Sequence, residues 1–497
     1  MSNIRVTYSG LIAFIVGIIG VVTGILFITI VTRRLNPEDL GLWTLIGSLV
    51  SYVVIVEPVI SYWTSRQIAR GEHVGKTALF TSGSFSCGAI IVYSIISFLV
   101  AFALKVDFFV LILASALVPL SFINNTLNGI ALSYKPQSIS YGIVIFEISK
   151  LPLGFLLVYL LDLGIIGAIL ATIMASIAKM IILFIMTRKQ LFNTIKYQVI
   201  KLWLKLSWIP LYNSLSGLIF TLDVLIYSLI TNSLIGLAFW GVAGAVSNIV
   251  GHSGQISQAL YPKLLASAKK EFAEENLKRL MFFAIPILSA SIVFAKPALH
   301  MLNPLYINGI YIVYFLAFRT LIYVIMNVFY NILGAYENID TDKQASFSQY
   351  LKSNLFFLPT LNYILSGSYV TILALFLILS KGMNLTEEYN ITIWSFILLA
   401  VTIPFMIYGL VSVKRQCQIL FPYHSVTKFS FIALIASIIT HLIMQRTLVY
   451  NPSIYDFVPQ LIPIVILGGV IYFGLAYAID RSARDLFKLV LKEIRKK

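Results

Sequence analysis

The chain contains fourteen long apolar stretches, and this pattern constrains its fold more than any other feature. A helix needs about 20 apolar residues to cross the hydrocarbon core of a bilayer. Charged residues make up only 11% of the 497 residues, whereas soluble proteins carry about a quarter. We therefore predict an all-α polytopic membrane protein with about 14 transmembrane helices, at residues 9–31, 40–63, 79–104, 108–131, 141–161, 164–186, 207–230, 237–260, 282–299, 310–333, 355–379, 391–408, 429–444 and 458–478.

The plan of the first two stretches returns in the seventh and eighth. A polar hinge at residues 32–39 precedes Gly41, and a second hinge at residues 231–236 ends on Gly236, which lies 195 positions later. Duplicated halves are common in secondary transporters. We expect two pseudo-symmetric six-helix lobes, the N-lobe at residues 1–190 and the C-lobe at residues 207–412, joined by an interfacial linker at residues 191–206. Two C-terminal helices at residues 413–480 and a basic amphipathic cytoplasmic tail at residues 481–497 follow.

The basic residues are distributed unevenly among the loops. With the N-terminus inside, 27 of the 36 Lys and Arg residues fall in inner segments and only 6 in outer loops. This bias follows the positive-inside rule, so we expect both termini to be cytoplasmic and the protein to lie in the cell membrane. The net charge of +16 is explained by these loops, and it indicates no nucleic-acid partner.

Motifs for catalysis and for metal binding are missing from the sequence. It contains no HExxH, GxSxG or Walker loop, and its two cysteines, Cys87 and Cys417, indicate neither a disulfide framework nor a metal cluster. Glu38 and Asp39 lie in a tight turn between two stretches, without the large outer domain that a membrane glycosyltransferase would need. We therefore expect a protein that is not an enzyme and has no cofactor or metal.

Several polar and charged residues lie inside the apolar stretches. A charge in hydrocarbon costs a few kcal/mol on insertion scales, so such residues normally face a cavity or a partner. Basic side chains here suit an anionic headgroup, and an acid suits a proton or a cation. The candidates for a substrate cavity are Lys150, Lys179, Arg319, Asn124 and Asn125, and the candidates for ion coupling or ion pairing are Glu57, Glu147 and Asp223.

A structural interpretation of the same residues stays open. Glu147 lies one turn from Lys150 on the same helical face, and Asp223 and Arg319 are able to pair across the C-lobe. The asparagine pair fits helix–helix hydrogen bonding. Lys179 is the strongest functional candidate, because no acid lies one turn away in its own stretch. From the ends of the stretches we expect Glu57, Lys150 and Lys179 in the inner half of the membrane.

Two short motifs carry a resemblance to a known family. Residues 31–43 read VTRRLNPEDLGLW, and residues 330–336 read YNILGAY. The first resembles the helix end and Arg-Leu-x-Pro-Glu turn with which polysaccharide-unit flippases of the multidrug/oligosaccharidyl-lipid/polysaccharide exporter superfamily begin. The second is similar to the sequence that members of that family have near the end of the tenth helix. Over the rest of the chain the resemblance lies in the topology.

This resemblance implies that the protein moves a polyprenyl-phosphate- or pyrophosphate-linked oligosaccharide from the inner to the outer leaflet. The two lobes would alternate around a cationic cavity, with H+ or Na+ as possible coupling ions. Two alternatives remain: a cation-coupled multidrug exporter of the same superfamily, and a membrane-embedded glycosyltransferase or polymerase. Membrane lipids are expected partners. Gly20 and Gly24 allow close helix packing, which we assign to contacts within a monomer.

Overall fold

A computed structural model describes residues 20, 23–135, 137–257, 260–261, 264, 269–337, 347–383, 385–481 and 483–485. Within these residues, 12 helices are long and apolar enough to cross a membrane, and a bent pair raises the number to 13. The protein is therefore a multi-pass helical membrane protein, and the predicted fold class is confirmed. Most of the first predicted stretch lies outside the described residues, although the chain is helical over residues 23–34.

The chain divides into two compact units. Unit 1 comprises Met1–Gly241 and Asn362–Glu387, and unit 2 comprises Val242–Leu361 and Glu388–Lys497. The lobes expected from the order of the chain, and the linker and tail between and after them, stay a prediction. Unit 1 contains α2 (Pro37–Val54), α3 (Pro58–Ala69), α4 (Gly75–Leu104), α5 (Phe108–Ala114), α6 (Leu117–Tyr134), α7 (Gln137–Gly154), the π-helical η1 (Phe155–Leu160), α8 (Gly164–Thr187), η2 (Arg188–Gln190), α9 (Tyr197–Lys205), α10 (Trp208–Thr231), the start of α11 (Ile235–Ser247) and most of α17 (Asn354–Ser380).

Unit 2 is organised around α13. The C-terminal helices α19 and α20 pack against it: the Tyr472 hydroxyl donates to the Phe282 carbonyl at 2.9 Å, and the Phe282 ring lies 5.3 Å from that of Phe429. Lys428 of α19 also pairs with Asp480, just after α20, at 3.1 Å. Unit 2 contains η3 (Asn248–Ser257), α13 (Lys270–Val293), α14 (Ala295–Leu302), η4 (Pro304–Gly309), α15 (Ile310–Ala335), α16 (Phe347–Lys352), most of α18 (Glu387–Cys417), α19 (Tyr423–Thr447) and α20 (Ile454–Ile479).

Several helix ends differ from the sequence prediction. The stretch expected at residues 282–299 covers the end of α13, which begins at Lys270, and most of α14. The first turns of α13 are charged, so hydropathy alone does not detect them. Helix α18 continues to Cys417 and α19 begins at Tyr423. The second stretch is not one straight helix. It consists of α2 and α3, which meet at an angle of 59°. Pro58 begins α3, and proline has no N–H to continue the hydrogen bonding of α2.

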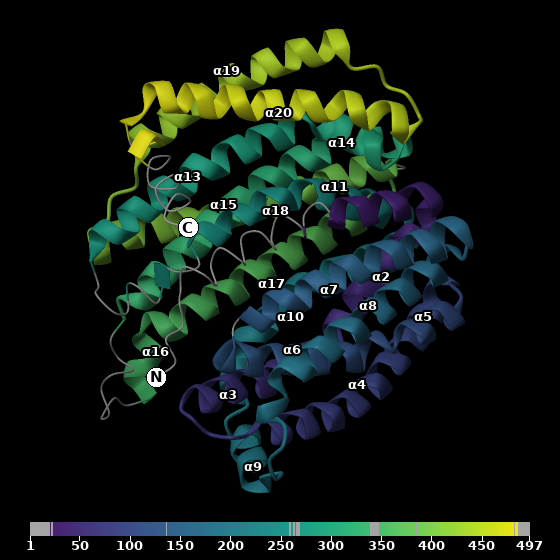
Figure 1. The fold of residues 1–497 in the computed structure, drawn as a ribbon, viewed down its shortest axis with the longest axis vertical. Coiled ribbons are helices and arrows are strands. Elements are labelled where there is room, and N and C mark those ends of the chain that lie inside the picture. The colour runs from purple at the N-terminus through teal and green to yellow at the C-terminus, as the bar shows by residue number, and fades with distance from the viewer. Residues whose placement is uncertain are drawn as a thin grey trace. The chain divides into compact units, whose positions relative to one another are not determined.

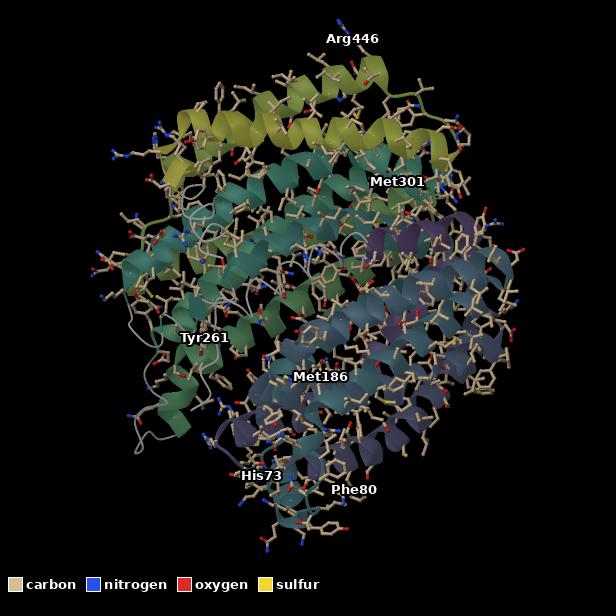
Figure 2. The ribbon with its side chains drawn as sticks, in the orientation of Figure 1. His73, Phe80, Met186, Tyr261, Met301 and Arg446 are labelled. Atoms are coloured by element: carbon tan, nitrogen blue, oxygen red, sulfur yellow. The ribbon has the colours of Figure 1, made fainter. Side chains whose placement is uncertain are left out.

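The linker contains one short helix at the end of unit 1. This helix, α9, lies beside the ends of α3 and α4 (Figure 1), and Figure 2 shows His73 and Phe80 in the same region. Trp203 of α9 is buried, and its indole N–H donates to Gln67 of α3 at 3.1 Å. The Lys196 N–H donates to Thr77 of α4 at 3.0 Å. These contacts fix the linker to unit 1, while its place in the membrane interface stays a prediction.

Two glycines bring the repeated hinge regions into direct contact within unit 1. A Cβ added at Gly41 of α2 would overlap the backbone carbonyl of Leu234, just before α11. A Cβ at Gly241 of α11 would come within 2.7 Å of the Thr44 hydroxyl on α2. The Leu234 carbonyl also accepts from the Ala238 N–H at 3.3 Å, so it has little freedom to move. The close approach of α2 to α11 therefore depends on glycine.

We predict that Gly41→Ala destabilises unit 1 by about 1–3 kcal/mol, the usual range for overpacking a well-packed contact. Gly47→Ala is the matched control on the same helix, because no atom lies within 4 Å of a Cβ added there. The control should be neutral or slightly stabilising, since alanine favours helix over glycine. Thermal unfolding of both variants in detergent micelles tests this, and an equal melting temperature would contradict the contact.

Candidate functional site

Lys150 and Glu147 form an ion pair on α7. The Lys150 Nζ lies 3.6 Å from the Glu147 Oε2, and both side chains are only 14% exposed. The same carboxylate oxygen accepts from the Thr23 hydroxyl at 3.0 Å. The ammonium group also lies 4.7 Å from the centre of the Phe27 ring and 4.9 Å from that of Phe146, within reach of a cation–π attraction.

Lys179 of α8 is half-buried and feels the charge of the same acid from the neighbouring helix, without forming an ion pair with it within 4 Å. Glu147 is therefore the one acid beside two lysines, Lys150 and Lys179. The three groups carry a net charge of about +1 when all are ionised. We call Thr23, Glu147, Lys150 and Lys179 the lysine cluster.

Small residues position the helices that carry the lysine cluster. At Gly154 of α7, an added Cβ would come within 2.6 Å of the Phe27 ring, so α7 lies directly against the helix over residues 23–34. At Gly142 of α7, the corresponding position is 3.2 Å from Leu183 of α8. Helical structure continues from Gln137 to Leu160. Lys150 is therefore near the middle of this segment, and its expected position in the inner half of the membrane stays a prediction.

Glu57 lies in the break between α2 and α3 and is 2% exposed. One carboxylate oxygen accepts from the Thr126 hydroxyl of α6 at 3.0 Å, and the other accepts from the Ser61 hydroxyl at 3.1 Å. A buried carboxyl group with hydroxyl partners at a helix break is suited to bind a proton. It is separate from the lysine cluster, because its hydrogen bonds run to α3 and α6.

The two asparagines of α6 have different surroundings. Asn124 is buried, and its amide donates to the Ser176 carbonyl of α8 at 3.1 Å. This is the helix–helix hydrogen bond that the structural interpretation expects. Asn125 is exposed on the surface of α6. Their hydrogen bonds do not join either residue to the lysine cluster, and a role in binding substrate stays a prediction for both.

Asp223 and Arg319 belong to different units. Asp223 of α10 is 4% exposed and accepts from the Tyr369 hydroxyl of α17 at 2.6 Å and from the Val224 N–H at 2.8 Å. Arg319 of α15 lies with its guanidinium carbon 4.5 Å from the centre of the Tyr323 ring. The ion pair expected between Asp223 and Arg319 stays a prediction.

Sequence reasoning missed the partners that come from other helices. Thr23 and Phe27 are four residues apart in the first predicted stretch, so helical spacing places them on one face. The sequence gives no sign that this face contacts α7. Ser61 follows Glu57 by one turn and was also readable. Thr126 and Tyr369 bond to acids far away in the chain, and periodicity within one helix gives no sign of such pairs.

Together, the many membrane-spanning helices and the charges buried among them define the class of the protein as a polytopic membrane protein with an internal polar site. Solved structures then specify the fold. Lipid II flippase MurJ in an inward closed conformation matches with a TM-score of 0.65 at 15% identity, over 97% of this chain and 100% of that one. An inward-facing multidrug resistance MATE family transporter of the MOP superfamily matches with a TM-score of 0.59 at 12% identity, over 82% and 98%.

An outward-facing MATE family transporter of the same superfamily also matches, with a TM-score of 0.54 at 16% identity over 82% of this chain and 96% of that one. No family model matches the sequence, and no curated protein does so. At these identities the likeness concerns the fold alone, which the chain shares with these MATE transporters and with the lipid II flippase. These neighbours are transporters and a flippase.

We predict strong coupling between Glu147 and Lys150. A double-mutant cycle of Glu147→Gln, Lys150→Gln and the double variant should give a coupling energy of about 1–3 kcal/mol, because the two charges lie 3.6 Å apart and are only 14% exposed. The control is the exposed pair Glu275–Arg279 on α13, for which a coupling below about 1 kcal/mol is expected. Denaturant unfolding in micelles measures both, and equal coupling energies would contradict a buried cluster.

Proposed function

We propose that the protein moves a polyprenyl-phosphate- or pyrophosphate-linked oligosaccharide across the cell membrane by alternating access. The observation that carries this proposal is the lysine cluster, in which Lys150 pairs with Glu147 at 3.6 Å and Lys179 of the neighbouring helix feels the charge of the same carboxylate. Because two lysines stand beside only one acid, the cluster has a net positive charge and attracts an anion. The fold supports the proposal, because it is shared with a lipid II flippase and with transporters.

The chemistry of the lysine cluster suits a phosphate group. An ammonium group offers three donors and no acceptor, and hydrogen bonds between charged partners contribute more than neutral ones. Phe27 and Phe146 surround the Lys150 ammonium and lower the local polarity, which strengthens its attraction for an anion. Glu147 compensates part of the positive charge while the site is empty.

A cation-coupled multidrug exporter is the second candidate, because multidrug transporters share this fold. Its substrates would be organic cations in many cases, and the net positive charge of the lysine cluster disfavours them. The acids Glu57 and Asp223 would serve such a transporter as coupling sites. The two candidates differ in the sign of the charge that the substrate brings to Lys150 and Lys179.

We predict that Lys150→Ala combined with Lys179→Ala lowers flipping of a labelled polyprenyl-pyrophosphate oligosaccharide in proteoliposomes by at least about 100-fold. A hydrogen bond to a charged group contributes about 1.5–3 kcal/mol, so each lysine accounts for at least about tenfold. Double replacement by arginine should retain part of the activity.

The matched control for this experiment is Lys105→Ala combined with Lys381→Ala, two exposed lysines just beyond α4 and α17. It removes the same charge and should leave flipping unchanged. Full flipping by the Lys150 and Lys179 variant would overturn the site. Export of cationic drugs by the wild type, with no flipping of the lipid-linked oligosaccharide, would favour the exporter instead.

Glu57 is the proposed site of proton coupling. Its carboxyl group lies at the break between α2 and α3, where a change of protonation is able to alter the hydrogen bonds to Ser61 and Thr126 and so the angle between the helices. We predict that Glu57→Gln, which imitates the protonated carboxyl, abolishes the response of flipping to an imposed pH gradient. Asp223→Asn is the control and should retain that response. Coupling to a Na+ gradient that is lost in Asp223→Asn would contradict this assignment.

A further inference from the structure

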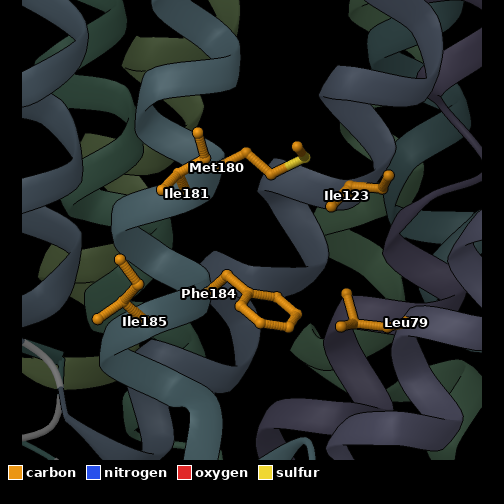
Figure 3. Close-up of a pocket in the computed structure, with 6 residues that line it drawn as sticks. All are labelled: Leu79, Ile123, Met180, Ile181, Phe184 and Ile185. Atoms are coloured by element: carbon orange, nitrogen blue, oxygen red, sulfur yellow. The ribbon is translucent and has the colours of Figure 1, made fainter.

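Unit 1 has an apolar groove that the proposed transport function does not use. It lies between α4, α6 and α8, has a volume of about 330 Å³, and is lined by Leu79, Ile123, Met180, Ile181, Phe184 and Ile185. Figure 3 shows Met180 and Phe184 reaching from α8 toward Ile123 and Leu79. Every lining side chain is apolar, so the groove suits a hydrocarbon chain.

The groove face of α8 ends in a basic residue. Ile181, Phe184, Ile185 and Arg188 follow the spacing i, i+3, i+4, i+7, which places them in one stripe along the helix. Arg188 is exposed and begins η2 directly after α8. The apolar stripe thus leads along α8 to a guanidinium group.

The opposite wall ends in the same way. On α4, Lys76 lies one turn before Leu79 and is exposed. The two walls meet at this end, because a Cβ added at Gly75 would overlap the backbone carbonyl of Gln190 in η2. Neither Lys76 nor Arg188 has an acidic partner within 4 Å among the residues that the structure describes. Each of these two walls of the apolar groove therefore carries an exposed cation one turn beyond its last lining residue.

We propose that this groove binds one anionic two-chain phospholipid, with an acyl chain between α4 and α8 and its phosphate at Lys76 and Arg188. The length supports a lipid of a single leaflet. From Met180 to Arg188 the helix rises by about 12 Å, which is less than the ~15 Å that one leaflet contributes to the hydrocarbon core. A polyprenyl carrier has a chain far longer than this groove. In the expected orientation, the site faces the inner leaflet.

The test is a native mass spectrometry titration of the purified full chain with phosphatidylglycerol and with phosphatidylcholine of the same chain length. The wild type should bind phosphatidylglycerol more tightly. Lys76→Gln combined with Arg188→Gln should weaken that binding by about 25-fold, at about fivefold for each basic residue near a lipid phosphate. Ile181→Trp, which adds bulk beside the groove, should weaken the binding of both lipids.

Two controls match these variants. Lys414→Gln combined with Arg415→Gln removes two exposed charges from the end of α18, and Ile95→Trp adds the same bulk at an exposed position elsewhere on α4; both should bind as the wild type does. Unchanged phosphatidylglycerol binding in the Lys76 and Arg188 variant would overturn the proposal. Displacement of the phospholipid by an equal amount of polyprenyl phosphate would also overturn it, by assigning the groove to the carrier lipid. The charge variant changes only exposed residues, so the test stands even where Ile181→Trp does not fold.

Discussion

The compensation of charge inside an apolar helix bundle is the constraint on which the functional site depends. An ammonium group away from water is costly unless a carboxylate, hydroxyl group or aromatic ring replaces its hydration. Around Lys150 all three kinds of group are present or close by, from α7 itself and from the helix over residues 23–34. The charge of the same carboxylate also acts on Lys179 of α8. The position of one acid, Glu147, therefore decides whether both lysines are stable as charged groups within the helix bundle.

Close backbone contacts provide the rigidity that such a cluster requires. Gly154 allows α7 to lie against Phe27, and Gly41 and Gly241 allow α2 and α11 to approach each other. Within a membrane, helix association relies on van der Waals packing more than on the hydrophobic effect, and small residues permit that packing. The glycines of this chain thus act in the same way at the lysine cluster and at the contact between the repeated hinges. Each lets two helices approach more closely than a side chain at that position would allow.

Hydropathy was sufficient to predict the helices, because a membrane-spanning segment must be apolar over its whole length. It failed at α13, where the charged turns from Lys270 onward continue the helix beyond the apolar stretch. The pair Glu147–Lys150 was readable from helical spacing alone. The contribution of Glu147 to Lys179, and that of Thr126 to Glu57, depend on which helices are neighbours, and a single sequence carries no signal for this. Local spacing therefore identified the candidate residues but not how they group.

If the lysine cluster binds substrate as proposed, its ratio of charges bears on transport as well as on stability. A transporter must bind its substrate and then release it, so a site with very high affinity for phosphate would be of no use. If each lysine had its own acid, little attraction for an anion would remain, and with no acid two like charges would repel each other in a medium of low polarity. One carboxylate shared by Lys150 and Lys179 lies between these limits. Under the proposed function, Glu147 would again compensate the lysines when a phosphate leaves, so release would not expose an uncompensated pair of charges.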